Sequence, residues 1–276
     1  MNRLSDEQRS AVISALVEGA SIRSTERMTG VHRDTITRLL LSVGDACGRL
    51  LNERIRNIFT RRVQVDEIWT FVFKKQAHLD RYDDHHELKG DQYVFVAMDA
   101  DSKLAITHYV GKRDATGAYY LLADLGNRLS SRIQLTTDAF RPYINAVEAV
   151  FGCEIDYGQV VKVYGENGTD NGAPSWYGPA HVLSAVPTPI VGDPDRRHIS
   201  TSFIERQNLT MRMQIRRFTR LTNAFSKKLA NLKAHVAMHF AWYNFARVHS
   251  TLRVTPAMEA GLTDHPWTLG EIIEAV

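Results

Sequence analysis

Residues 63–73 read Val-Gln-Val-Asp-Glu-Ile-Trp-Thr-Phe-Val-Phe, and this stretch decides the fold that the rest of the chain predicts. Its β-branched and aromatic residues are typical of a strand. An aspartate inside so apolar a strand is costly to bury unless it is paired or coordinates a cation. We therefore predict a central strand that presents Asp66 to a metal site. Because adjacent strand residues point to opposite faces of a sheet, we expect Asp66 and Glu67 not to serve the same site.

Further strands and helices follow in an order that predicts an α/β fold. Four more strands are expected, at residues 91–99, 103–110, 133–137 and 160–164. Helices are expected at 114–129 and at 142–151, where a proline suits the first helical turn. This order predicts a mixed five-stranded sheet with flanking helices on both faces. Ligands gather at the carboxyl ends of parallel strands, and Asp138 lies at such an end.

A strongly basic stretch follows. Residues 196–233 contain ten Lys and Arg residues and one acidic residue, Glu205. The apolar positions of a helix around it are expected to be Ile204, Leu209, Met213 and Ile215. A surface ion pair with a neighbouring arginine would contribute only about 0.3–0.5 kcal/mol. We instead predict that Glu205 is a metal ligand on a helix whose basic residues hold a polyanion.

The first 60 residues predict an all-α domain. Residues 21–28 and 32–43 read as short helices joined by a turn at Gly30, and a further helical stretch is expected at 45–59. Two such helices form a helix-turn-helix, whose second helix places its first residues on the base edges of the major groove. Those residues are His32, Arg33, Thr35 and Arg38. The alternative is a helical bundle used only for oligomerisation.

Charge is distributed unevenly along the 276 residues. Lys and Arg outnumber Asp and Glu eleven to seven in residues 1–62 and twelve to five in 196–276, whereas residues 63–195 hold eleven basic and nineteen acidic residues. This pattern suggests basic ends that touch a polyanion and an acidic middle that holds cations. Two cysteines cannot form a disulfide framework or a zinc site, and no apolar run nears the length of about 18 residues that suggests a membrane span. A reducing cytosol fits this composition.

Together, three motifs resemble the DDE triad of insertion-sequence transposases, which belong to the ribonuclease-H-like, retroviral-integrase superfamily. They are Asp66 in Val-Asp-Glu-Ile-Trp, Asp138 after Leu-Thr-Thr and Glu205 in Phe-Ile-Glu-Arg-Gln-Asn. Arg212, seven residues after Glu205, matches the Lys or Arg that many members carry there. Residues 242–260 also resemble the ending of these enzymes.

The resemblance implies a helix-turn-helix domain at 1–60, a ribonuclease-H-like catalytic domain at 61–260 and a C-terminal tail at 261–276. It implies a transposase that cleaves DNA at the inverted-repeat ends of an insertion sequence and transfers the strands to a target. Asp66, Asp138 and Glu205 would hold Mg²⁺ or Mn²⁺, as two ions about 3.5–4 Å apart. Phosphates would be gripped by Arg206, Arg212, Arg216, Arg217 and Arg220.

The expected partners are double-stranded DNA, both transposon ends and target, and a second copy of the chain, because two ends must be brought together. No membrane association is expected, and the expected location is cytoplasmic, on the bacterial nucleoid. The interval from Asp138 to Glu205 is long, and residues 165–198 would form a long loop or insertion. Other acids in that interval remain candidates for the third ligand: Glu166, Asp170, Asp193 and Asp195.

Three other functions remain open. One is a non-catalytic DNA-binding regulator derived from a transposase, and another is a nuclease that cuts DNA without joining strands. A tyrosine recombinase would use residues such as His239, Tyr243 and Arg247, but the strands expected at 63–110 argue against its helical catalytic domain.

Overall fold

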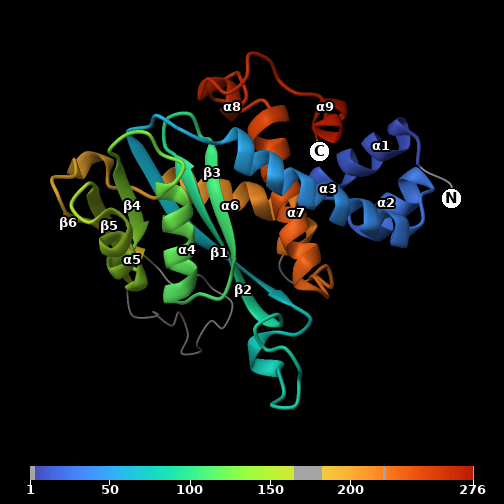
Figure 1. Ribbon diagram of the computed structural model, residues 1–276. Helices are drawn as coiled ribbons and strands as arrows, with labels where there is room; N and C mark the ends of the chain where they lie inside the picture. Colours follow the sequence, from blue (N-terminus) through green and yellow to red (C-terminus); the bar gives the residue numbers. More distant parts are fainter. Residues whose placement is uncertain (1–3, 165–181, 220–221, 276) are drawn as a thin grey trace.

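Six strands form one mixed sheet in the order β3-β2-β1-β4-β5-β6 (Figure 1). In the computed structural model, which describes residues 4–164, 182–219 and 222–275, they are β1 (Arg62–Val72), β2 (Gly90–Asp99), β3 (Ala105–Gly111), β4 (Gln134–Asp138), β5 (Asp156–Tyr164) and β6 (Val182–Val191). β1, β4 and β5 run parallel, and the other three strands pair antiparallel with their neighbours. The predicted mixed α/β sheet is confirmed, and its five strands are corrected to six.

The sixth strand, β6, lies in the stretch that was expected to be a loop or insertion. It contains Pro187 and Pro189, which pair in register with Val160 and Gly158 of β5. Proline cannot donate to a strand ladder, so it is confined to edge strands, and β6 is the edge of this sheet. The two prolines of this stretch are therefore compatible with an edge strand. Residues 165–181 of the expected loop lie outside the described residues.

Helices cover both faces of the sheet. They are α1 (Asp6–Val17), α2 (Ile22–Thr29), α3 (Arg33–Arg54), α4 (Ala115–Gly126), α5 (Pro142–Phe151), α6 (Ser202–Gln214), α7 (Leu229–Ala241), α8 (Pro256–Glu259) and α9 (Leu269–Glu274), with short turns η1 (Gln76–His78), η2 (Arg196–His198), η3 (Arg216–Phe218) and η4 (Trp242–Ala246). α4 packs on β2 and β3, where Gly117 lies against the ring of Phe95. On the opposite face, the side-chain oxygen of Gln64 in β1 accepts from the first amides of α6, those of Phe203 and Ile204. No helix within the described ranges is long and apolar enough to cross a membrane.

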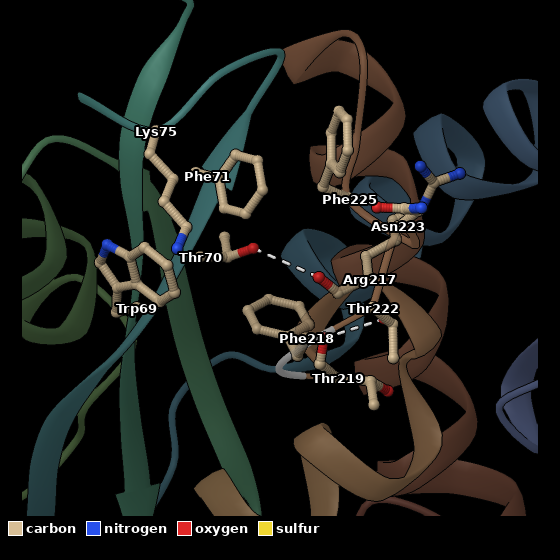
Figure 2. A pocket seen from close by; sticks show the side chains of 10 residues that line it. All are labelled: Trp69, Thr70, Phe71, Lys75, Arg217, Phe218, Thr219, Thr222, Asn223 and Phe225. Atoms are coloured by element: carbon tan, nitrogen blue, oxygen red, sulfur yellow. Dashed lines mark hydrogen bonds between the residues drawn. The ribbon is translucent and has the colours of Figure 1, made fainter. Parts of the chain in front are cut away.

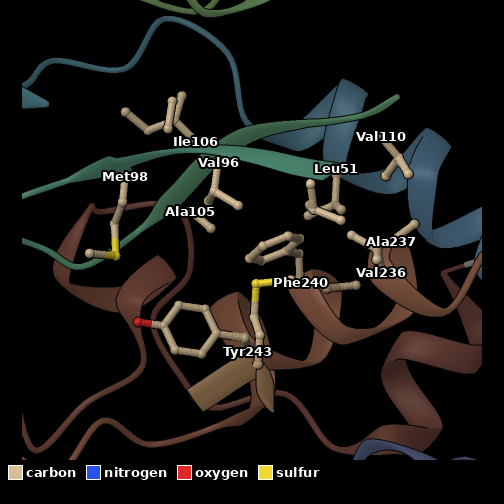
Figure 3. Packing of buried hydrophobic residues seen from close by; sticks show 14 of the residues in the cluster. Leu51, Val96, Met98, Ala105, Ile106, Val110, Val236, Ala237, Phe240 and Tyr243 are labelled. Carbon is tan, nitrogen blue, oxygen red and sulfur yellow. The ribbon is translucent and has the colours of Figure 1, made fainter. Parts of the chain in front are cut away.

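The N-terminal helices share a hydrophobic core with the sheet. α3 is one continuous helix of 22 residues, so the break expected between residues 43 and 45 is wrong. Its Gly44 packs so closely on α7 that a Cβ there would lie 2.5 Å from Cβ of Ala234. Beyond that contact, Phe240 of α7 lies beside Leu51, and Tyr243 of η4 lies on the other side of Phe240 from Leu51, in the same buried cluster (Figure 3). Packing on α7 therefore keeps α3 helical through its glycine.

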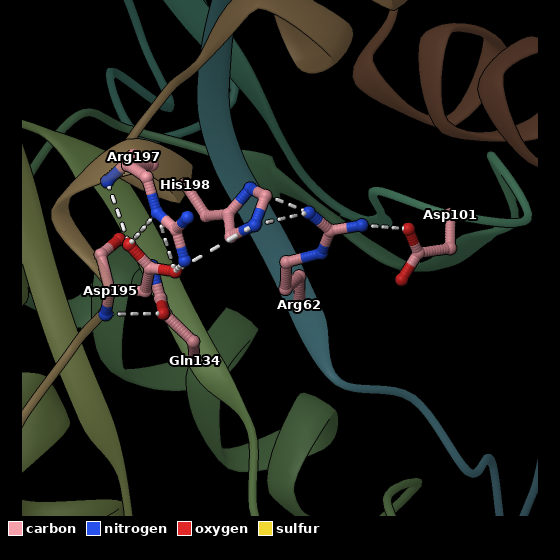
Figure 4. Close-up of polar contacts among 6 residues, drawn as sticks. All are labelled: Arg62, Asp101, Gln134, Asp195, Arg197 and His198. Carbon is pink, nitrogen blue, oxygen red and sulfur yellow. Dashed lines mark hydrogen bonds and ion pairs between the residues drawn. The ribbon is translucent and has the colours of Figure 1, made fainter.

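Polar contacts hold the segment that leads into α6 (Figure 4). Arg62 at the start of β1 contacts both Asp101 and His198. The backbone amide of Asp195 donates to Gln134 of β4 at 2.9 Å, and Gln134 returns a bond to the Asp195 carbonyl. These contacts fix residues 195–198 across the sheet and so aim α6 along β1.

The buried face of α6 differs in part from the predicted one. Ile204 and Ile215 are buried as expected, together with Met211. Leu209 and Met213 instead face solvent, with exposed fractions of 45% and 71%. Buried polar side chains, Gln207 and Asn208, take their place on the inner face of the helix, which orients α6 for polar contact with β1.

Candidate metal and phosphate site

Two predicted aspartates meet where β1 and β4 diverge. Pairing between these parallel strands ends at Gln64 and Thr136, and Asp66 and Asp138 follow two residues later on each strand. One carboxylate oxygen from each of Asp66, Glu67 and Asp138 lies within 4.8 Å of the other two. The structure therefore gathers three carboxylates at one point of the sheet.

Glu67 belongs to this group, so the expectation that it could not share a site with Asp66 is wrong. The two side chains do start on opposite faces: Asp66 accepts from Asn208 of α6, whereas the charge of Glu67 acts on Tyr143 of α5. Among the described residues, no strand pairs with β1 beyond Gln64 on the β4 side, where only an isolated bridge joins Val72 to Ser226. Both side chains can therefore turn into the gap between the strands, where Asp138 lies.

Burial makes two of these carboxylates unusually basic. It raises the pKa of Asp66 to about 6, and the charges of Asp138 and Glu205 raise it too. Burial likewise raises the pKa of Glu67 to about 7, helped by Asp138 and opposed by the Arg113 guanidinium. Negative charge crowded into a poorly solvated place is costly unless a cation neutralises it.

The electrostatics and the donor set fit a divalent cation. Oε1 of Glu67 is buried without a hydrogen-bond partner among the described residues, and the Glu67 side chain is only 2% exposed. Hard cations such as Mg²⁺ and Mn²⁺ take carboxylate oxygens. Asp66, Glu67 and Asp138 together could hold such an ion.

Glu205 approaches this group from α6. Its Oε1 lies 2.6 Å from Nζ of Lys162 on β5 and accepts a 2.9 Å hydrogen bond from the Thr201 hydroxyl. Glu205 is outside the group within 4.8 Å, but its charge raises the pKa of Asp66. Asn208, one helical turn after Glu205, donates to Oδ2 of Asp66 at 2.9 Å. α6 thus presents its acid and its amide to the same carboxylate on β1.

Cations line the space beside the carboxylates. A cavity of about 500 Å³ extends from Asp138 and is lined by Arg113, Arg141 and Lys162 as well as by Phe140. The Arg113 guanidinium lies 3.3 Å from Asp138 and 3.6 Å from Glu67 and stacks 3.9 Å from the Phe140 ring centre. In such an arrangement, the carboxylates could hold a metal ion while the adjoining cations bind the oxygens of a phosphate group next to it.

The predicted DNA-contacting residues lie in two places. His32, Arg33 and Arg38 are exposed at the start of α3, and Thr35 is half-buried there. Arg206 is exposed on α6, whereas Arg212, Arg216 and Arg217 are half-buried, and Arg220 lies outside the described residues.

The other candidates for the third ligand lie away from the carboxylate group or outside the described residues. Asp195 caps η2 and pairs with Arg197 at 2.7 Å, and Asp193 is exposed. Glu166 and Asp170 lie outside the described residues. Among the residues proposed for a tyrosine recombinase, His239 and Tyr243 are buried, which disfavours an attacking Tyr243.

Sequence reasoning missed four side chains at this site: Glu67, Arg113, Arg141 and Lys162. The pairing register of β4 and β5 would have located Lys162. Asp138 pairs with Val160, and Lys162 is two residues further along β5, on the same face of the sheet. The sequence contains no comparable signal for Arg113, which follows β3 and reaches the site through its long side chain.

Comparison with protein-family models gives no match, and comparison with curated proteins gives none either. Among solved structures, the chain is similar to the Mos1 transposase paired-end complex with the left transposon end, the Mos1 mariner paired end complex with Mn and the Mos1 strand transfer complex. The identities are 15%, 14% and 16%, each over 54% of this chain, with a TM-score of 0.22 in each case. The similar region spans 57%, 57% and 56% of those chains. A TM-score of 0.22 assigns neither fold nor activity, which therefore rest on the residues of this chain.

Proposed function

We propose that the protein is a DDE-type insertion-sequence transposase that cleaves DNA at the ends of a mobile element and joins the freed 3′ ends to a target. The observation that carries the proposal is the meeting of Asp66 and Asp138 on diverging parallel strands, with Glu205 facing them from a basic helix. Such a carboxylate group beside cations suits the displacement of one phosphate oxygen by another.

The carboxylates Asp66, Glu67 and Asp138 would hold Mg²⁺ or Mn²⁺, and Glu205 would complete the set after leaving Lys162. When bound, the cation supplies Lewis-acid stabilisation of the charge that develops on the reacting phosphodiester. Arg113 and Lys162 would bind the non-reacting phosphate oxygens in the adjoining cavity. Asn208 would hold the Asp66 carboxylate in one orientation through its hydrogen bond.

DNA would be recognised at the start of α3 and gripped by the basic residues of α6 and η3. In this proposal, residues 1–60 form the helix-turn-helix domain and 61–260 the ribonuclease-H-like domain, followed by a tail. The protein would act as an oligomer on DNA in the bacterial cytoplasm. Base contacts by Arg33 and Arg38 would choose the DNA end, while the arginines of α6 and η3 would add sequence-independent, salt-sensitive affinity.

The test is cleavage of a duplex carrying the inverted repeats that flank the reading frame of this protein, in Mg²⁺ or Mn²⁺. Asp66→Asn, Asp138→Asn and Glu205→Gln should each abolish cleavage and leave binding of the duplex intact. Glu148→Gln, an exposed acid on α5, is the matched control and should cleave normally. A triad variant with normal cleavage removes that residue from the site.

A specific outcome would favour each alternative function. Wild-type protein that binds the duplex but never cleaves it would be the non-catalytic regulator. Cleavage without any joined product would identify a nuclease. Joined products that depend on all three acids support the transposase.

A further inference from the structure

A second cavity lies between the N-terminal helices and the segment that links α6 to α7. It measures about 360 Å³, and its cationic lining residues are Arg23, Arg216, Arg217 and Lys227. None of its lining residues is acidic. Of the four cations, Arg23 has an acid nearby, Glu26 at 3.3 Å on the same helix. The cavity therefore carries a large excess of positive charge.

Arg217 has a buried guanidinium whose hydrogen-bond partners are neutral. The residue is partly exposed, but its guanidinium is desolvated enough to lower its pKa to about 10. Within the described part of the chain it is bound by neutral groups: it donates to Nδ1 of His235 at 3.1 Å and to the Ser226 hydroxyl at 3.0 Å. A guanidinium removed from water without a carboxylate beside it is costly for a folded protein to keep.

His235 cannot supply the missing charge. It accepts from Arg217 at Nδ1, so its proton is on Nε2, which faces the Leu16 carbonyl at 3.3 Å. Its pKa is lowered well below the ordinary value, first by burial and then by the Arg217 charge, so the ring stays neutral. This hydrogen-bond chain leaves the charge of Arg217 uncompensated.

The cavity also receives the start of α2. Ser21 caps that eight-residue helix by accepting from the amide of Ser24, and Ile22 and Arg23 line the cavity beside it. The positive end of the helix dipole adds to the four side-chain charges. In Figure 2, the Arg217 guanidinium lies beside Asn223 and turns toward the N-terminal helices, away from Trp69 and Lys75 of the neighbouring aromatic cavity.

We propose that this cavity is an anion site that takes a backbone phosphate of DNA, and that Arg217 and Lys227 are its principal ligands. The assignment to DNA rests on the proposed function, whereas the binding of a phosphate group does not. A bound phosphate supplies the counter-charge that Arg217 lacks. It also bridges the start of α2 and the segment around η3, the two parts of the chain that line the cavity.

Two neighbouring lysines give a matched pair for the test. Lys227 lines the cavity and Lys228 does not, although both are exposed. The first measurement is thermal unfolding in inorganic phosphate and in chloride at equal ionic strength. Phosphate should raise the Tm of the wild type and of Lys228→Gln by several degrees more than that of Lys227→Gln or Arg217→Gln. Each variant is read against its own value in chloride, so any loss of stability from the substitution cancels.

The second measurement is the salt dependence of duplex binding. Removing one phosphate contact should lower the slope of log affinity against log salt by about 0.9. Lys227→Gln should show this loss, and Lys228→Gln should keep the wild-type slope. Equal slopes for the two variants overturn the DNA assignment, and equal phosphate protection overturns the anion site. Both measurements are repeated with Asp66→Asn protein, which is expected to bind the duplex without cutting it. If the wild type proves unable to cleave but the two lysine variants still differ, the transposase proposal falls and this one stands.

Discussion

The side-chain amide of Asn208 donates a 2.9 Å hydrogen bond to Oδ2 of Asp66, across the boundary between helix α6 and strand β1. Asn208 follows Glu205 by three residues, so it lies on the same side of the helix. The distance between the two acids therefore depends on this one contact as well as on the apolar packing of α6. A metal site that draws ligands from a strand and a helix needs such a fixed spacing.

Replacing Asn208 should impair catalysis without affecting DNA binding. In Asn208→Ala the Asp66 carboxylate loses its orienting donor, and we expect cleavage to slow by about 10–100-fold, as is usual for residues that orient metal ligands. Thr210→Ala is the control, because within the described residues the hydroxyl of Thr210 donates to the carbonyl of Arg206 in its own helix and does not reach β1. Single-turnover cleavage at several Mn²⁺ concentrations measures the effect. Equal rates for the two variants would show that Asn208 does not position Asp66.

Glu67→Gln tests whether the unexpected third carboxylate holds the cation. The substitution removes one ligand charge, so we expect the Mg²⁺ concentration for half-maximal cleavage to rise by about 10-fold. Without metal, the variant should unfold at a higher temperature than the wild type, because a buried charge has been removed. Glu87→Gln, an exposed acid in the β1–β2 connection, should change neither quantity. If the Mg²⁺ concentration for half-maximal cleavage does not change, Glu67 does not bind the cation.

Stability should depend on pH through Asp66 and Glu67. Their pKa values of about 6 and about 7 exceed the ordinary values of 3.8 and 4.5, so the folded state binds these protons more tightly than the unfolded state does. Their contribution is therefore present at low pH and is lost as pH rises from about 4 to about 7, on the order of 3 kcal/mol for each group. Urea unfolding at pH 5 and pH 7.5 measures the part of this loss that falls between those two pH values.

Divalent cations and neutral variants should reverse that loss. Mg²⁺ should stabilise the protein more at pH 7.5 than at pH 5, because ions bind the deprotonated carboxylates. The double variant Asp66→Asn, Glu67→Gln should lose less stability between the two pH values than the wild type. If the free energy of unfolding depends on pH in the same way in the wild type and the double variant, burial does not raise the pKa values of these two carboxylates.

The strand that carries Asp66 could be predicted because most of its residues are β-branched or aromatic. The order of the strands and helices around it then predicted the mixed sheet. The grouping of Glu67 with Asp66 could not be predicted. The rule that neighbouring side chains point to opposite faces of the sheet applies to a strand that has partners on both sides. β1 loses its partner on one side after Gln64. The same limit applies to β6, in which Pro187 and Pro189 are compatible with a strand because no described residue pairs on its outer side. Local sequence does not reveal where a sheet ends.

Helix α3 shows how packing overrides a local signal. Gly44 followed by Asp45 reads as the end of one helix and the start of another, yet α3 continues through both residues. A glycine inside a helix costs about 0.5–1 kcal/mol relative to alanine. Here the missing side chain admits α7, which contributes the buried residues Leu232 and Val236 to the common core. The two glycines of α3 should therefore respond differently to substitution.

Gly44→Ala should destabilise the protein and Gly48→Ala should stabilise it. A Cβ at Gly44 would lie 2.4 Å from the carbonyl oxygen of Ala234, so α3 and α7 must move apart, at a cost of about 1–3 kcal/mol. A Cβ at Gly48 would meet only Cβ of Ala237 at 4.0 Å, an ordinary contact, and the helix would gain the propensity of alanine. Thermal unfolding of the two variants gives the comparison. If Gly44→Ala also raises the Tm, α3 does not pack on α7 as closely as described, and the N-terminal helices are then free to move relative to the sheet.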